Sequence, residues 1–173
     1  MAQKGFIEPA EKVRRFYKTV EVRPADGGFE VSLDGRAPRS SRGTRLTAPT
    51  QALAGILAEE WDAQGEFIEL AGMHATRLAY TALEAIPAAR EATADQFAQY
   101  AGSDLLCYFA ESPQELVARQ TEHWEPVLAR AEHELAVAFA RAVGIRHEPQ
   151  PEGTLAAIRA AALSTSDFGL AGL

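Results

Sequence analysis

The sequence changes character near Pro49 and Thr50. Residues 1–49 contain 10 lysines and arginines against 6 acidic residues, whereas residues 50–173 contain 7 against 18. Alanine, the strongest helix former, occurs 5 times before position 50 and 29 times from there on. The earlier part has the alternation typical of strands. We therefore predict an α+β fold, with a small antiparallel β-rich domain over 1–49 and an all-helical domain over 50–173.

The overall composition is that of a globular protein. Of the 173 residues, 47% are apolar and 24% are charged. No apolar run reaches the roughly 18 residues of a membrane-spanning helix, so we expect no membrane insertion. A net charge of −7 disfavours a general nucleic-acid binder. The one cysteine, Cys107, excludes an internal disulfide framework.

Alternating residues predict three or four antiparallel strands in the first domain. The expected strands cover 16–23, 29–33, 36–40 and 44–47. Pro24–Gly28 forms a turn cluster, and Asp34-Gly35 is a strong hairpin signal.

Apolar residues at helical spacing predict helices in the second domain. The expected helices cover 50–65, a segment from 73 that ends before Pro87, and 88–101. A long helix starts at 112, and Gly144 ends it or a continuation of it; residues 154–163 begin another helix. Thr50 is suited to an N-cap, and Gly65 to the end of the first helix. The apolar run 105–109 is compatible with a buried strand or with a helix end.

The clearest helix start is at Ser112, with Pro113 in the first helical position and Glu115 completing a capping box. Pro126 is expected to kink the helix behind it. One broad apolar face is formed by Leu116, Val117, Trp124, Val127, Leu128, Ala131 and Leu135.

Residue chemistry favours a binding protein over an enzyme. No phosphate-binding loop, metal-ligand pattern or nucleophile elbow occurs, so we expect no cofactor and no catalytic residues. Cys107 lies among large apolar side chains, which is typical of a core cysteine. A small enzyme using Cys107 or a carboxylate pair is kept as an alternative.

Two tryptophans lie in polar surroundings and mark candidate partner contacts. Trp61 is flanked by acidic residues; we expect it to pack in the core, with a partner contact as the alternative role. Arg119 and Gln120 lie about one turn before Trp124, and Arg119 could pair with an acid such as Asp104. The candidate partner-binding residues are Glu60, Trp61, Asp62, Gln64, Asp104, Arg119, Gln120 and Trp124.

An ordered series of motifs carries a family resemblance. The motifs are Arg15-Phe16-Tyr17-Lys18, Leu33-Asp34-Gly35-Arg36, Pro49-Thr50, Glu60-Trp61-Asp62-Ala63-Gln64, Thr76-Arg77-Leu78-Ala79, Tyr100–Tyr108, Arg119-Gln120 and Trp124 with Pro126. Together they resemble the ATP-twelve family, the assembly chaperones of the F-type ATP synthase. The resemblance covers about residues 14 to 126.

The resemblance implies a function and an architecture. Family members bind the free α subunit of the catalytic head and keep it from aggregating until it pairs with β. They consist of a small β-rich domain followed by a helical domain, and they usually continue past the position of Leu173. We therefore expect a chain shortened at its C-terminus. An interaction protein of the same fold with another partner remains the alternative.

Cellular location follows from the same features. One cysteine and no targeting signal indicate a reducing compartment, for which we expect a bacterial cytoplasm, with the mitochondrial matrix as alternative. We expect a monomer.

Overall fold

The computed structural model describes residues 13–173, which form two compact units. Unit 1 runs to Ala88, and unit 2 spans Ala89–Ala171. The units therefore divide at residue 88, whereas the sequence changes character near residue 49.

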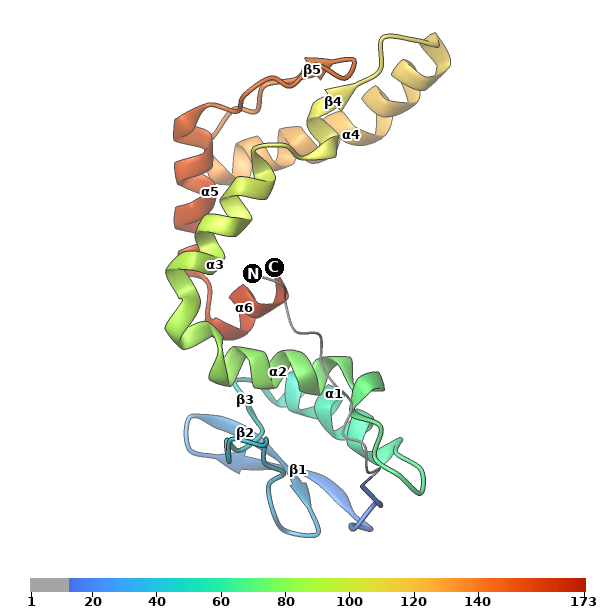
Figure 1. The fold of residues 1–173 in the computed structure, drawn as a ribbon, viewed down its shortest axis with the longest axis vertical. Helices are drawn as coiled ribbons and strands as arrows, with labels where there is room; N and C mark the ends of the chain where they lie inside the picture. Colours follow the sequence, from blue (N-terminus) through green and yellow to red (C-terminus); the bar gives the residue numbers. More distant parts are fainter. Residues whose placement is uncertain (1–12) are drawn as a thin grey trace. The chain divides into compact units, whose positions relative to one another are not determined.

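Unit 1 contains a three-stranded antiparallel sheet in the order β1-β2-β3 (Figure 1). Its strands are β1 (Val20–Ala25), β2 (Gly28–Leu33) and β3 (Thr47–Ala48). Close packing requires glycine at position 28, because a Cβ there would lie 2.4 Å from the carbonyl oxygen of Ala48. The central strand β2 carries the buried residues Val31 and Leu33.

Three details of the sheet differ from the sequence prediction. The first strand begins at Val20 rather than Phe16, and it includes Pro24, which an edge strand tolerates. The expected strand over 36–40 is reduced to single bridges, Leu33 with Arg36 and Arg39 with Arg45. The Asp34-Gly35 turn is confirmed, with both residues at positive φ.

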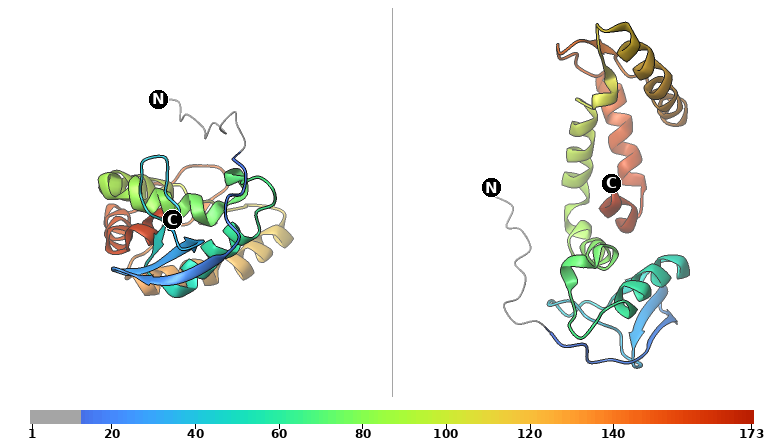
Figure 2. Two further views of the ribbon diagram at one scale, coloured as in Figure 1. Left: turned by 90° about the horizontal axis from the view of Figure 1, so that it is seen from below. Right: turned by 90° about the vertical axis from the view of Figure 1, so that its right-hand side faces the viewer.

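Two helices complete unit 1. Helix α1 (Gln51–Asp62) begins where the sequence predicted, since the Thr50 hydroxyl accepts a hydrogen bond from the amide of Leu53 at 3.2 Å. Its apolar side packs on the sheet (Figure 2). A short 3-10 turn, η1 (Leu70–Gly72), leads into α2 (His74–Glu84).

Unit 2 is mainly helical. Helix α3 (Ile86–Ala101) is followed by the 3-10 turn η2 (Leu105–Cys107) and strand β4 (Tyr108–Phe109), which pairs in parallel with β5 (Ala142–Val143). The apolar run 105–109 is therefore a helical turn and then a short strand. The remaining helices are α4 (Gln114–Leu135), α5 (Glu152–Ser164) and α6 (Asp167–Gly172).

Helix α4 differs from its prediction at both ends. Its N-cap is Pro113 in an extended conformation, so the Ser112 cap was predicted one residue too early. The helix ends at Ala136, which adopts a left-handed conformation, and does not continue to Gly144. It runs through Pro126, whose expected kink stays a prediction.

Arginine contacts attach the last helices of unit 2 to α3. The Arg159 guanidinium pairs with Glu91 and Asp95 of α3. Arg90 of α3 pairs with Asp167 and donates to the carbonyls of Leu163 and Thr165, both at 2.8 Å. In both figures α5 lies beside α3.

Within residues 13–173, no helix combines the length and apolar character needed to cross a membrane.

Candidate functional site

The eight predicted partner-binding residues fall into two sets, one in each unit. The first set is Glu60, Trp61, Asp62 and Gln64, at the end of α1. The second set is Asp104, Arg119, Gln120 and Trp124, in unit 2. Most of these side chains are engaged by contacts inside their own unit.

Glu60 holds the start of α2. Its two carboxylate oxygens accept hydrogen bonds from the backbone amides of Ala75 and Thr76, at 2.7 and 2.8 Å. Amides in the first turn of a helix have no partner within the helix, and the positive end of the helix dipole favours a carboxylate. Glu60 therefore caps α2 from the neighbouring helix.

Trp61 belongs to the core of unit 1. Only 6% of its surface is exposed, and its ring lies edge-on to Tyr17 with the centroids 5.8 Å apart. The Tyr17 hydroxyl donates to the Trp61 carbonyl at 2.6 Å. Burial is the main cause that raises the pKa of Tyr17. The structure confirms core packing, the role that the sequence favoured for Trp61.

Asp62 and Gln64 fix the chain around Arg15. The guanidinium of Arg15 donates to the backbone carbonyls of both residues and pairs with the Asp62 carboxylate at 3.2 Å. The Gln64 amide nitrogen donates to the Glu60 carbonyl at 2.9 Å. These bonds join the segment before β1 to the end of α1.

Three residues of the second set also have internal partners. Asp104 accepts from the amide of Leu106 at 2.8 Å and so caps η2. Gln120 accepts from the amide of Ala110, also at 2.8 Å. Trp124 lies edge-on to Phe109, with the ring centroids 5.8 Å apart.

Arg119 differs from the other seven. Its side chain is exposed, and within residues 13–173 it forms no ion pair. The pairing with Asp104 that the sequence allowed is not formed in the described residues, where Asp104 accepts from the amide of Leu106. Arg119, like the exposed Asp62 and Asp104, has a charged group that is accessible to a partner.

An apolar groove of about 200 Å³ lies within unit 2. Its lining includes Phe97 and Ala101 from α3, Leu106 and Cys107 from η2, Val127, Leu128, Ala131 and Leu135 from α4, then Phe139 and Ile158. Asp104 is the charged residue among them. A surface of this composition can bind apolar side chains but offers few groups for chemistry.

The floor of the groove is buried, whereas its rim is open to solvent. Leu128 and Ile158 are each 4% exposed, and Val127 is 52% exposed. Tyr100 and Leu105, which adjoin lining residues in the sequence, are 66% and 70% exposed. Groups of exposed large apolar residues commonly mark protein-binding surfaces.

Cys107 lies in the floor of this groove. It is 1% exposed, and burial is the largest cause that raises the pKa of its thiol. The cysteine is therefore a core residue, as its apolar neighbours in the sequence indicated. Among the described residues, no group of three histidine, cysteine or acidic side chains is arranged to hold a metal ion.

A cluster of charges fixes the chain that returns from α4. Arg141 pairs with Glu125 at 2.9 Å and also with Glu132. The Glu132 carboxylate accepts a hydrogen bond from the amide of Phe139 at 2.7 Å. The hydrogen bond from Arg141, and then that from the Phe139 amide, hold the pKa of Glu132 below its usual range. Phe139 is thereby positioned in the groove.

Of the eight predicted site residues, Asp104 lines this groove, and the apolar lining was not predicted as a site. The sequence placed Val127 and Leu135 on one apolar face of a long helix, and the structure leaves much of that face uncovered. The signal was present in the amphipathic pattern, but a pattern does not show which apolar positions a neighbouring element covers.

Comparison with known proteins identifies relatives of this chain. A family model described as ATP12 chaperone protein matches residues 14–132. The crystal structure of Atp12 from Paracoccus denitrificans is 37% identical with a TM-score of 0.84, over 92% of this chain and 68% of that one. A mutant of the same protein gives the same values. A protein from Agrobacterium tumefaciens is 38% identical with a TM-score of 0.82, over 91% of this chain and 60% of that one.

Proposed function

We propose a client protein and a binding surface for this chain. The premise is that the chain belongs to the ATP12 chaperone family, which acts in ATP synthase assembly. The client is the unassembled α subunit of the catalytic head. The chain binds this subunit and keeps it from aggregating until it pairs with β. The alternative is a protein of the same fold that serves another partner.

The apolar groove of unit 2 is the observation that carries this proposal. A subunit made for a larger assembly exposes apolar interface before it is assembled, and such surface promotes aggregation. The groove offers a matching apolar floor with an accessible rim at Val127. Occupation of the groove by the client lowers the concentration of free, aggregation-prone subunit by mass action.

The net charge of unit 2 indicates which kind of client surface it would attract. Residues 89–171 carry 12 acidic residues against 6 arginines and no lysine. Opposite charges at an interface rim steer association and suppress wrong partners. The client segment is therefore expected to have an apolar centre and basic flanks. Arg119 would meet an acidic group at the edge of this contact.

The proposed mechanism consists of binding and release. Binding to α requires no covalent step, and β displaces the chaperone by competing for the same apolar surface. The named relatives come from the bacteria Paracoccus denitrificans and Agrobacterium tumefaciens, which supports a bacterial cytoplasmic location for this chain.

The direct test is co-expression of the α subunit without β, in the presence and absence of this chain. We expect more soluble α with the chain present, and recovery of both proteins together in a pull-down. Val127→Asp should reduce this gain several-fold, because a carboxylate in the apolar rim must be desolvated on binding.

Ile56→Asp is the matched control. Ile56 is 50% exposed on α1, so the change adds the same charge at a similarly exposed aliphatic position outside the groove. Absence of α from the pull-down with the unmodified chain would refute the choice of client. Equal activity of Val127→Asp and the unmodified chain would refute the groove as its binding surface.

A further inference from the structure

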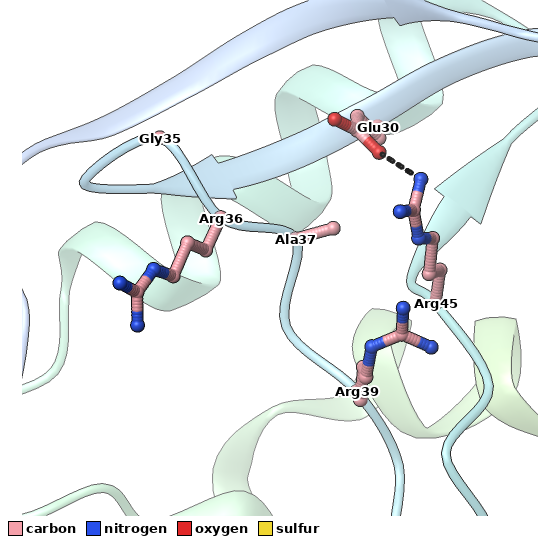
Figure 3. Close-up of a pocket in the computed structure, with 6 residues that line it drawn as sticks. All are labelled: Glu30, Gly35, Arg36, Ala37, Arg39 and Arg45. Atoms are coloured by element: carbon pink, nitrogen blue, oxygen red, sulfur yellow. Dashed lines mark ion pairs between the residues drawn. The ribbon is translucent and has the colours of Figure 1, made fainter.

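A second hollow, of about 430 Å³, lies on unit 1 beside the central strand. Its lining is Glu30 of β2 together with Gly35, Arg36, Ala37, Arg39 and Arg45 of the following loop (Figure 3). Three arginines and one glutamate give these residues a net charge of +2. The chain as a whole carries −7, so this basic hollow is a local reversal of charge.

Its positive charge is incompletely neutralised by the protein. Glu30 reaches Arg45 at 3.8 Å, the pair drawn as a dashed line in Figure 3. Arg39 donates to the backbone carbonyl of Gly43, and Arg36 extends to the other side of the loop. Neither Arg36 nor Arg39 forms an ion pair within residues 13–173.

The backbone places two of these cations directly opposite one another. Arg39 and Arg45 form an isolated antiparallel bridge, which aligns their side chains across the loop. Like charges at opposed positions destabilise a pair of strands. An anion bound between the two guanidinium groups would relieve that repulsion.

The loop is held in this conformation by other parts of unit 1. The Ser40 hydroxyl donates to the Glu84 carboxylate at the end of α2, and the Ser40 oxygen accepts from the amides of Arg42 and Thr44 at 3.1 and 3.2 Å. The hydrogen bond from Ser40 is the main cause that lowers the pKa of Glu84. Because the loop is already ordered, binding there requires little further loss of entropy.

A second anchor fixes the start of the loop. The Asp34 carboxylate accepts from the amide and the hydroxyl of Thr19, both at 2.8 Å. These bonds, with one from the Lys18 amide, lower the pKa of Asp34. The loop is therefore held near Asp34 and at Ser40, on either side of Arg36 and Arg39.

We propose that the basic hollow binds an acidic segment of a partner protein through carboxylate–guanidinium pairs. The planar guanidinium fork matches a carboxylate in two-point geometry. Arg39 and Arg45, which lie opposite one another, can each pair with one carboxylate. The negative charge of Glu30 in the hollow repels an anion of higher charge density than a carboxylate. The acidic residues in the rest of the chain repel a long polyanion such as nucleic acid. This contact does not depend on the identity of the client at the apolar groove.

The probe is a hexaglutamate peptide, titrated into the full chain at low salt and followed by calorimetry, with hexaglutamine as the uncharged match. The double variant Arg39→Gln/Arg45→Gln should weaken hexaglutamate binding by about tenfold or more, because two charge-assisted contacts are lost. The control is Arg14→Gln/Arg130→Gln, which removes the same charge from two exposed arginines outside the hollow.

Hexaglutamate binding that is lost in the first double variant and kept in the control supports the proposal. Equal binding to both variants refutes it, as does equal binding of hexaglutamine. Tighter binding of inorganic phosphate or of a DNA oligonucleotide, abolished by the same two changes, also refutes it in favour of a phosphate site. Circular dichroism of both variants excludes loss of folding as the cause.

Discussion

The apolar faces of α1 and α4 have different surroundings. On α1, Ala54, Leu57 and Trp61 are buried against a sheet. On α4, Leu128 is buried, while Leu116 and Val127 are 40% and 52% exposed. The sheet packs on α1 along these three residues, whereas α4 is contacted by β4, η2 and α5, which leave Leu116 and Val127 open. The same kind of sequence pattern therefore forms a core in unit 1 and a groove in unit 2.

The largest expected effect is on the core of unit 1. Trp61→Ala should lower the free energy of unfolding by about 3–5 kcal/mol, because it removes a large buried ring packed against Tyr17. Urea denaturation measures the change. Trp61→Phe, which keeps an aromatic ring there, should cost less. Similar losses for both variants would contradict the packing role.

Removal of the cap on α2 should have the next largest effect. Glu60→Ala leaves the amides of Ala75 and Thr76 without their acceptor and should cost about 1–2 kcal/mol in the free energy of unfolding. Glu59→Ala changes the exposed acidic neighbour on the same helix and should be close to neutral. If the two variants unfold at the same denaturant concentration, Glu60 does not act as the cap.

Unit 2 should show a smaller, pH-dependent effect at Glu132. Its pKa is lowered from an ordinary value of 4.5 in the folded state, so its contribution to stability is present above that value. The contribution is lost as the pH falls through the folded pKa. Glu132→Gln should therefore be less stable than the unmodified chain near neutral pH, and this difference should shrink on acidification.

Thermal unfolding at several pH values tests this dependence. Glu134→Gln is the control, because Glu134 is the exposed partner of Arg130 on the same helix. A stability difference for Glu132→Gln that stays constant between about pH 6 and pH 3 would show that the ion pair with Arg141 is not its source.

The smallest effect on stability is expected at the groove rim. Val127→Ala should change the free energy of unfolding by no more than about 0.5 kcal/mol, because the side chain is half exposed. Denaturant unfolding measures this change. Leu57→Ala, at a fully buried position of α1, is the comparison and should cost about 2–5 kcal/mol. If Val127→Ala and Leu57→Ala lowered the free energy of unfolding equally, Val127 would contribute to the core as Leu57 does. The difference between the apolar faces of α1 and α4 would then be refuted.

Several local elements were predictable because their signals lie within a few residues. The Thr50 cap and the Asp34-Gly35 turn depend on side-chain reach and on positive φ. The start of α4 was missed by one residue, since Pro113 suits an extended cap as well as a first helical position. The ion pairs of Arg141 with Glu125 and Glu132 were not predictable from the sequence. They form because the chain turns back at Ala136, after the end of α4.

The partner-binding role of the eight candidate residues stays a prediction, but the structure shows what several of their side chains contact. Glu60, Gln64 and Gln120 looked available for a partner, yet each is engaged by a backbone group of its own unit. Polar residues near a tryptophan can serve a surface or a core. Sequence spacing does not distinguish the two, because it omits the backbone groups that reach them from other elements.

The sequence by itself determined the α+β class, the helix start at Thr50, the core character of Cys107 and membership of a chaperone family. These depend on composition, on short-range backbone preferences and on an ordered series of motifs. Tertiary structure alone decided that the face of α4 is half open, that Glu60 is a cap and that Arg39 and Arg45 lie opposite one another. Each of these is a contact, or a missing contact, between separate segments, and periodicity specifies which residues share a face without specifying what covers it.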